Sequence, residues 1–378
     1  MARYSWNEST LLGRIDKLDK MIEKETDEKE LAKLYYYYDM LNAEVYNYFY
    51  MPYADVPLTK RMPDLYGLFL GNNRYYKMLD VYYDAIKDNI DLISENEIKR
   101  DEIIDQINDA TKAYVTKEKA ISICYDFYNE LDEELYEHFK SFYDKRFNHL
   151  HFFDPKLIQT LEYGGVQYYM YGINESFIDV AGSNNPYMIV AIIHEIAHAI
   201  DNYMNPDGFF DRSYFSEVTS LFMQLVAYYK KVGNFGELYY YYELLNYLSS
   251  FYIIAIDGYT YSNIMDTYSE NQFNMSKEFF EKIKNCYGKN RNSFYSFMKK
   301  YNPHHICYPI SMSLALNFFD IYKKDEKKGI EKLKEFINTN NKEDYFHLFL
   351  SDEFTETVSN SMKNILINSK ECFERHIK

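Results

Sequence analysis

Cysteine is scarce in this sequence. The four cysteines stand far apart, at Cys124, Cys286, Cys307 and Cys372, and no two of them form a CxxC pair. Such spacing excludes a cysteine-based zinc motif and a disulfide framework, and no cysteine has an evident activating partner. The pattern is typical of a reducing compartment, so we expect a cytoplasmic protein.

Apolar runs of membrane-spanning length and an excess of positive charge are also lacking. The N-terminal residues do not form the apolar core of a signal peptide, and the apolar stretch 189–200 is interrupted by polar residues. The formal net charge is −16, which disfavours binding to nucleic acids and to anionic membranes. We therefore expect neither a nucleic acid nor a membrane as a partner, and the sequence leaves the oligomeric state open.

The most informative segment that is present is His194-Glu195-Ile196-Ala197-His198, which apolar residues flank on both sides. On a helix, residues four apart share one face, so the imidazoles of His194 and His198 can converge on a common point. Two neutral imidazoles provide two ligands of a tetrahedral zinc site, and Glu195 is then placed as a general base for water. Asn184 or Asn185 suits the N-cap of this helix, with Pro186 in its first turn.

Glu217 is the expected third ligand. It lies in 213–230, a second segment with helical apolar spacing, and a loop containing Asn, Pro, Asp and Gly separates the two segments. If the two helices run antiparallel, Glu217 comes to lie beside His194 and His198. A His-His-Glu set with an open fourth position is a catalytic zinc arrangement, so we predict one zinc ion per chain.

The rest of the chain predicts a mainly α fold with one small β-sheet or hairpin next to the zinc helix. Residues 5–50, 64–116 and 117–147 have helical spacing, and the chain is again helical from 186 onward. Paired glycines and β-formers at 157–172 and 176–181 predict the strands. We expect an N-terminal helical region at 1–150, forming a wall or lid, and a catalytic region at 151–378, joined in one continuous two-lobed unit.

Two further segments carry candidate substrate contacts. The segment 301–311 contains His304, His305 and Tyr308 just before a predicted apolar helix over 312–322, and a tetrahedral intermediate needs a donor besides zinc. His305 and Tyr308 are the preferred candidates for that donor. In the strand region, an exposed edge can pair with the main chain of an extended peptide, and a glycine allows a close approach. The candidate substrate-binding residues there are Tyr169, Tyr171 and Gly172.

Five segments together resemble the thimet oligopeptidase and oligoendopeptidase F family of zinc metallopeptidases. These segments are 168–172, Asp179-Val180, 194–199, 216–224 and 305–310. The resemblance implies an enzyme with a multi-helix fold that hydrolyses oligopeptides inside a deep channel. It also implies that His194, His198 and Glu217 bind zinc, that Glu195 is the general base and that His305 contacts the substrate carbonyl or the intermediate.

This sequence departs from the family pattern in several respects. Gln224 stands where the family usually has glutamate, and we expect Gln224 and Ser220 to support the metal ligands from behind. The late motif lacks the tyrosines that usually follow its proline, so Tyr308 or a tyrosine of another segment has to supply a hydroxyl. The chain is also shorter than usual members, mainly in its N-terminal half.

Two alternatives to an oligopeptide-cleaving endopeptidase stay open. A two-His, one-Glu aminopeptidase requires a group that binds the free α-amine, and Glu175 is available near the strand region. A catalytically weak or inactive peptide-binding protein on the same scaffold is the other alternative, and Gln224 and the missing late tyrosines motivate it.

Overall fold

Helices make up most of the chain that the structure describes, as the sequence predicts. The computed structural model describes residues 8–27, 34, 38, 41, 73–143, 150–153, 164–170, 175–205, 215–251, 255, 307–340 and 342–377. The helices are α1 (Glu8–Ile22), α4 (Asn73–Asp88), α5 (Ile90–Glu102), α6 (Ile104–Thr111), α7 (Lys117–Leu131), α8 (Glu133–Tyr143), α9 (Tyr187–Met204), α10 (Val218–Tyr229), α14 (Cys307–Lys324), α15 (Glu326–Asn338) and α16 (Asp352–His376). A further helix covers 237–251, and a 3-10 helix covers Lys342–Leu350.

The predicted strand region forms a small sheet. Strands β2 (Gly165–Met170) and β3 (Glu175–Ala181) pair antiparallel as a hairpin, with Gly165 opposite Val180. Strand β1 (Leu150–Phe153) pairs parallel with the other side of β3, so the order is β1-β3-β2. The sequence did not indicate β1, because four residues are too few to establish an alternating pattern. Among the described strands, β2 therefore lies at an edge.

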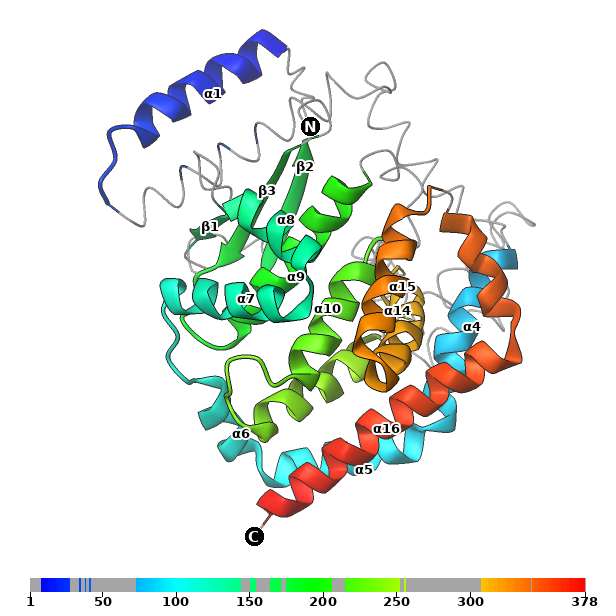
Figure 1. Ribbon diagram of the computed structural model, residues 1–378. Coiled ribbons are helices and arrows are strands. Elements are labelled where there is room, and N and C mark those ends of the chain that lie inside the picture. The colour runs from blue at the N-terminus through cyan, green and yellow to red at the C-terminus, as the bar shows by residue number, and fades with distance from the viewer. Residues whose placement is uncertain are drawn as a thin grey trace, which may run out of the picture.

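Helix α9 carries the His-Glu-x-x-His segment through the centre of the molecule. It packs against β2 and β3 on one side and against α7, α8 and α10 on others, as Figure 1 shows. Its isoleucines are all buried, which is expected of a helix that is apolar around its whole circumference. The N-cap position of α9 is Pro186 rather than either predicted asparagine, and just before it the side-chain oxygen of Asn185 accepts a hydrogen bond of 3.1 Å from the Tyr187 amide.

The helices of the N-terminal region pack against the end of the chain. Helices α4 and α5 lie along α16, and α14 contacts both α4 and α16. Inside this packing, the side-chain amide of Asn96 on α5 donates a hydrogen bond of 2.9 Å to the carbonyl of Leu366 on α16. The part of the predicted N-terminal region from α4 onward thus shares a core with the catalytic region, and the boundary near residue 150 stays a prediction. No described helix combines the length and the apolar character needed to span a membrane.

Candidate active site

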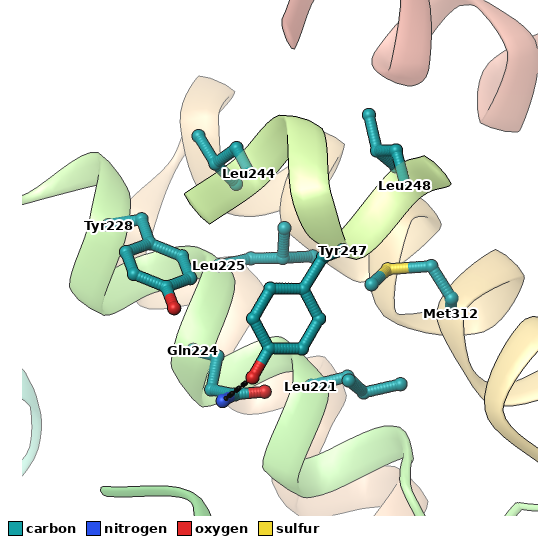
Figure 2. Close-up of a pocket in the computed structure, with 8 residues that line it drawn as sticks. All are labelled: Leu221, Gln224, Leu225, Tyr228, Leu244, Tyr247, Leu248 and Met312. Carbon is teal, nitrogen blue, oxygen red and sulfur yellow. Dashed lines mark hydrogen bonds between the residues drawn. The ribbon is translucent and has the colours of Figure 1, made fainter. Parts of the chain in front are cut away.

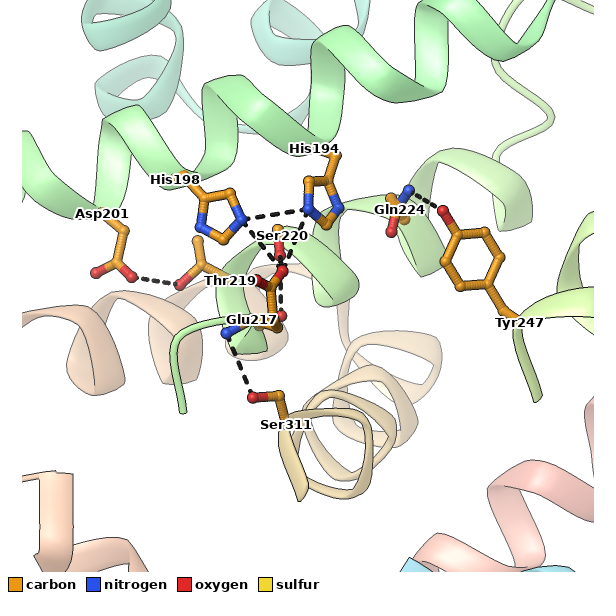
Figure 3. Close-up of polar contacts among 9 residues, drawn as sticks. All are labelled: His194, His198, Asp201, Glu217, Thr219, Ser220, Gln224, Tyr247 and Ser311. Atoms are coloured by element: carbon orange, nitrogen blue, oxygen red, sulfur yellow. Dashed lines mark hydrogen bonds and ion pairs between the residues drawn. The ribbon is translucent and has the colours of Figure 1, made fainter. Parts of the chain in front are cut away.

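His194, His198 and Glu217 meet at one point between α9 and α10. The Nε2 atoms of the two histidines are 3.2 Å apart, and Oε2 of Glu217 lies 3.2 Å from His194 Nε2 and 3.1 Å from His198 Nε2 (Figure 3). The three ligand atoms thus form a nearly equilateral triangle. The structure brings together the three residues that the sequence singled out as metal ligands.

The antiparallel pairing of α9 and α10 brings Glu217 to the histidines. Near the end of α9, Asp201 accepts a hydrogen bond of 3.2 Å from the Thr219 hydroxyl. One turn earlier His198 contacts Glu217, and one turn before that His194 lies beside Gln224. Helix α10 begins later than the predicted span of 213–230, so Glu217 is its N-cap residue. A residue just ahead of the first turn can direct its side chain across the helix end, toward the neighbouring helix.

Hydrogen bonds fix the Glu217 side chain in this position. The Ser220 hydroxyl donates to Glu217 Oε2 at 2.9 Å, while the backbone amide of Glu217 donates to the Ser311 hydroxyl of α14 at 3.3 Å. Glu217 is 5% exposed and Ser220 is fully buried. The carboxylate is therefore oriented by groups that cannot exchange freely with water.

The electrostatics of this cluster favour a bound cation. Burial raises the pKa of Glu217, but the charge of His198 and the hydrogen bonds from both imidazoles outweigh burial and hold it well below its usual value. Burial lowers the pKa of His194, but Glu217 and Glu195 outweigh burial and raise it to about 9. Without a metal, a proton on His194 balances part of the carboxylate charge, and a divalent cation can take its place.

The spacing of the triangle fits a small tetrahedral cation. Zinc binds imidazole nitrogen and carboxylate oxygen at about 2.0–2.2 Å, which places two ligands of a tetrahedron about 3.3 Å apart. The observed separations of 3.1–3.2 Å are close to that value. The donor set is also one that zinc prefers, because it combines imidazole nitrogens with a carboxylate oxygen.

Glu195 lies next to this cluster, in close contact with the start of β2. A Cβ atom added to Gly165 would lie 2.8 Å from Glu195 Cγ and 3.1 Å from its Oε1, which is closer than van der Waals contact allows. Gly165 therefore lets the strand approach the side chain of Glu195. Burial and the nearby charges of Glu217 and Asp179 raise the pKa of Glu195, against the lowering effect of the two histidines.

A pocket of about 350 Å³ opens in front of Glu195 and His194. Two helix faces form its walls, one on α9 and one on the helix 237–251. On each helix the lining residues are three or four positions apart or adjacent to such positions, as expected for one face. The remaining lining comes from the start of β2, from α10 and from the first turn of α14. The lining residues are Gly164, Gly165, Tyr187, Ala191, His194, Glu195, Gln224, Glu243, Asn246, Tyr247, Ser250, Phe251 and Tyr308.

Gln224 lies behind His194, at the position where the sequence predicted a supporting residue. Its side-chain amide donates a hydrogen bond of 2.5 Å to the Tyr247 hydroxyl, as Figures 2 and 3 show. The Oε1 atom of Gln224 and the Nδ1 atom of His194 are both buried, and neither has a hydrogen-bond partner among the described groups. Gln224 is nevertheless close enough to His194 to contribute to its raised pKa.

The other predicted contact residues fall partly within the described chain. Tyr308 lies in the first turn of α14, lines the pocket and stacks on Phe251 with ring centroids 5.4 Å apart. The Glu217 charge, together with burial, holds its pKa well above the usual value, so its hydroxyl keeps its proton. Tyr169 is a β2 residue paired with Ser176, and only its backbone is described. His304, His305, Tyr171 and Gly172 lie outside the described residues.

Sequence reasoning missed several residues of the pocket. Gly165 precedes the predicted glycine contact at 172, and only the approach of β2 to α9 reveals its importance. Glu243, Tyr247 and Phe251 share one face of the helix 237–251, and their spacing of four residues was a signal in the sequence. The many tyrosines concealed that signal, because tyrosine recurs along the whole chain.

Comparison with known proteins supports the fold. No protein-family model matches the sequence, and no curated protein matches it either. Solved structures do resemble it. One is a candidate oligoendopeptidase F from Bacillus anthracis str. Ames, with 15% identity, a TM-score of 0.56, and alignment over 95% of this chain and 67% of that chain.

Two other structures resemble the chain to a similar degree. PZ peptidase A with inhibitor 2 has 12% identity and a TM-score of 0.57, with 95% of this chain and 67% of that chain aligned. A candidate peptidase from Chlamydophila abortus has 12% identity and a TM-score of 0.55, with 96% and 64% aligned. This chain thus spans about two thirds of their length and shares their multi-helix fold.

Proposed function

We propose that this protein is a zinc-dependent metalloendopeptidase that hydrolyses peptide bonds in oligopeptides. The observation that carries the proposal is the triangle of His194, His198 and Glu217, with Glu195 beside it in a pocket. The fold shared with structures named as peptidases supports the same class of enzyme. His194, His198 and Glu217 would hold one zinc ion, which when bound supplies a Lewis acid for the scissile carbonyl.

Glu195 is the general base in this proposal. It is 7% exposed, and its raised pKa lies closer to neutral pH than the pKa of an exposed glutamate. A pKa nearer the working pH makes a carboxylate a more effective general base. A carboxylate in this position takes a proton from the attacking water and passes it to the leaving amine. The close approach of Gly165 to the Glu195 side chain limits the orientations of the carboxylate.

Tyr308 and the edge of β2 handle the substrate. The protonated hydroxyl of Tyr308 donates to the oxygen that becomes negative in the transition state, and His305 from the adjoining segment is the second proposed donor. The outer edge of β2 faces no other described strand, so an extended peptide can add to it by main-chain hydrogen bonds. Tyr169, Tyr171 and Gly172 stay the proposed substrate contacts.

An aminopeptidase with Glu175 as the amine-binding group fits less well. Glu175 pairs with Met170 at the end of the hairpin opposite Gly165, which contacts Glu195. Five residues of antiparallel strand cover about 17 Å, whereas a substrate α-amine lies one residue from the bond that an aminopeptidase cuts. The cytoplasmic location stays a prediction; the described cysteines, Cys124, Cys307 and Cys372, are buried free thiols.

The test is peptide cleavage by the zinc-loaded protein, with Glu195→Gln as the matched variant. A mixed pool of N-terminally blocked peptides is digested and the fragments are identified by mass spectrometry. We expect internal cleavage that a chelator abolishes, and a Glu195→Gln protein that folds and binds zinc but is at least about 10²-fold slower. Unchanged turnover by Glu195→Gln would disprove the assigned base. A zinc-loaded protein that cuts no peptide would indicate the peptide-binding alternative.

A further inference from the structure

Glu243 is a half-buried carboxylate that the proposed reaction does not use. It lines the pocket from the helix 237–251, and burial raises its pKa to about 7. Among the described residues, no hydrogen bond or ion pair holds this carboxylate, and no lysine or arginine lines the pocket with it. An unpaired carboxylate inside a protein is unfavourable, so its position at a pocket wall points to a ligand that compensates for it.

Tyr187 and Tyr247 line the pocket together with this carboxylate. After burial, the charges of Glu243 and Glu195 raise the pKa of Tyr187 to about 12, so Tyr187 lies near both carboxylates. The Glu243 charge also raises the pKa values of Tyr239 and Tyr247, and the buried Tyr239 hydroxyl has no hydrogen-bond partner among the described groups. Aromatic rings pack well against the alkyl chain of a lysine or arginine and attract its charge.

The position of Glu243 along the pocket gives its distance from the reacting bond. Glu243, Tyr247 and Phe251 follow one another on one helix face, about 6 Å apart along the axis. The Tyr247 hydroxyl accepts a hydrogen bond from Gln224, which lies behind His194 (Figure 2). Phe251 stacks on Tyr308. Tyr247 and Phe251 therefore mark the reactive end of the pocket. For a peptide that runs along this helix and rises about 3.4 Å per residue, the distances of about 6 and 12 Å from Glu243 to these two residues correspond to roughly two or three residues from the scissile bond.

We propose that Glu243 is a specificity residue, which binds a cationic group of the substrate two or three residues from the cleaved bond. The cationic group is a lysine or arginine side chain or a free α-amine, since each presents the same positive charge and hydrogen-bond donors. This inference rests on the proposed function only in taking the pocket as the peptide-binding site. The net charge of −16 adds a long-range attraction for the same substrates.

Binding measurements on the full zinc-loaded chain test this proposal without requiring cleavage. All proteins carry Glu195→Gln, and binding is followed by fluorescence anisotropy. The probes are N-acetylated heptapeptides in which one lysine is moved along an uncharged sequence, with norleucine at that position as the reference. One further probe has a free α-amine and no lysine. We expect lysine at one or two positions to tighten binding about ten-fold or more over norleucine.

Variants assign that preference to Glu243. Adding Glu243→Gln should make the lysine and norleucine peptides bind equally, whereas Glu243→Asp should keep part of the preference. Glu371→Gln removes the same charge from an exposed position on α16 and should leave the preference unchanged. Circular dichroism checks that each variant is folded. If the free-amine probe gains affinity instead of the lysine probes, the α-amine is the bound group.

The outcomes separate this proposal from the proposed function. Equal binding of lysine and norleucine peptides, or a preference that survives Glu243→Gln, overturns the role of Glu243. If the preference depends on Glu243 but the enzyme with Glu195 intact cuts none of these peptides, the hydrolase assignment fails and the cation site stands. If that enzyme cuts them without preference, only the cation site fails.

Discussion

Gly165→Ala tests the contact that holds the proposed general base. The added methyl group would lie 2.8 Å from Glu195 Cγ, and an ordinary carbon–carbon contact of about 3.5 Å requires a shift of about 0.7 Å. It would also lie 3.2 Å from the backbone oxygen of Asp179, which belongs to β3 in the same hairpin and cannot easily move. The side chain of Glu195 is therefore the group that gives way.

The size of the effect follows from that displacement. Overpacking of a buried contact costs about 1–3 kcal/mol in the free energy of unfolding, so Tm should fall by a few degrees. A misplacement of about 1 Å reduces catalytic rates by up to about 10²-fold, so we expect kcat to fall about ten-fold or more. Zinc content should stay unchanged, because Gly165 contacts none of the three proposed ligands closely.

The assays are steady-state cleavage of a blocked peptide, metal content by atomic emission, and thermal unfolding. Gly13→Ala on α1 is the matched control, since a Cβ atom there meets nothing within 4 Å. In a Glu195→Ala background the clashing Cγ is absent, so most of the destabilisation by Gly165→Ala should disappear. An unaltered kcat, or a stability loss that persists in full in that background, would refute the reasoning.

Three further predictions follow from the same site. Glu217→Ala should leave the dialysed protein with little zinc, and Ser220→Ala should weaken zinc binding about 10–100-fold, both measured by competition with a chromophoric chelator; full retention by both variants would contradict the ligand set. Tyr308→Phe should lower kcat about 10²–10³-fold at unchanged zinc content, and a normal kcat would exclude its hydroxyl as a donor. Because the pKa of Glu243 is raised to about 7 from 4.5, the folded protein binds a proton on Glu243 more strongly than the unfolded chain does. The free energy of unfolding should therefore fall by up to about 3 kcal/mol as pH rises from 4.5 to 7. Glu243→Gln should therefore raise Tm at pH 8 but not at pH 4.5, and an equal effect at both pH values would contradict the raised pKa.

The sequence by itself determined the local parts of this protein. Helical periodicity put His194 and His198 on one face, and the separation of four residues holds in any α-helix regardless of its neighbours. Asn185 accepts a hydrogen bond from the first turn of that helix, and paired glycines with β-formers predicted the β2–β3 hairpin, because these preferences act within a few residues. The antiparallel return of α10, which carries Glu217, followed from the turn residues between two apolar helices.

Only the tertiary structure decided which distant groups meet around these local parts. The parallel pairing of β1 with β3, the contact of Gly165 with Glu195, and the face of 237–251 that puts Glu243 in the pocket join elements far apart in the chain. Such contacts depend on how whole helices and strands pack, and periodicity shows which face of an element is buried but not which partner covers it. The sequence therefore indicated the proposed metal ligands, whereas the shape and charge of the pocket came from the packing of α9 against its neighbours.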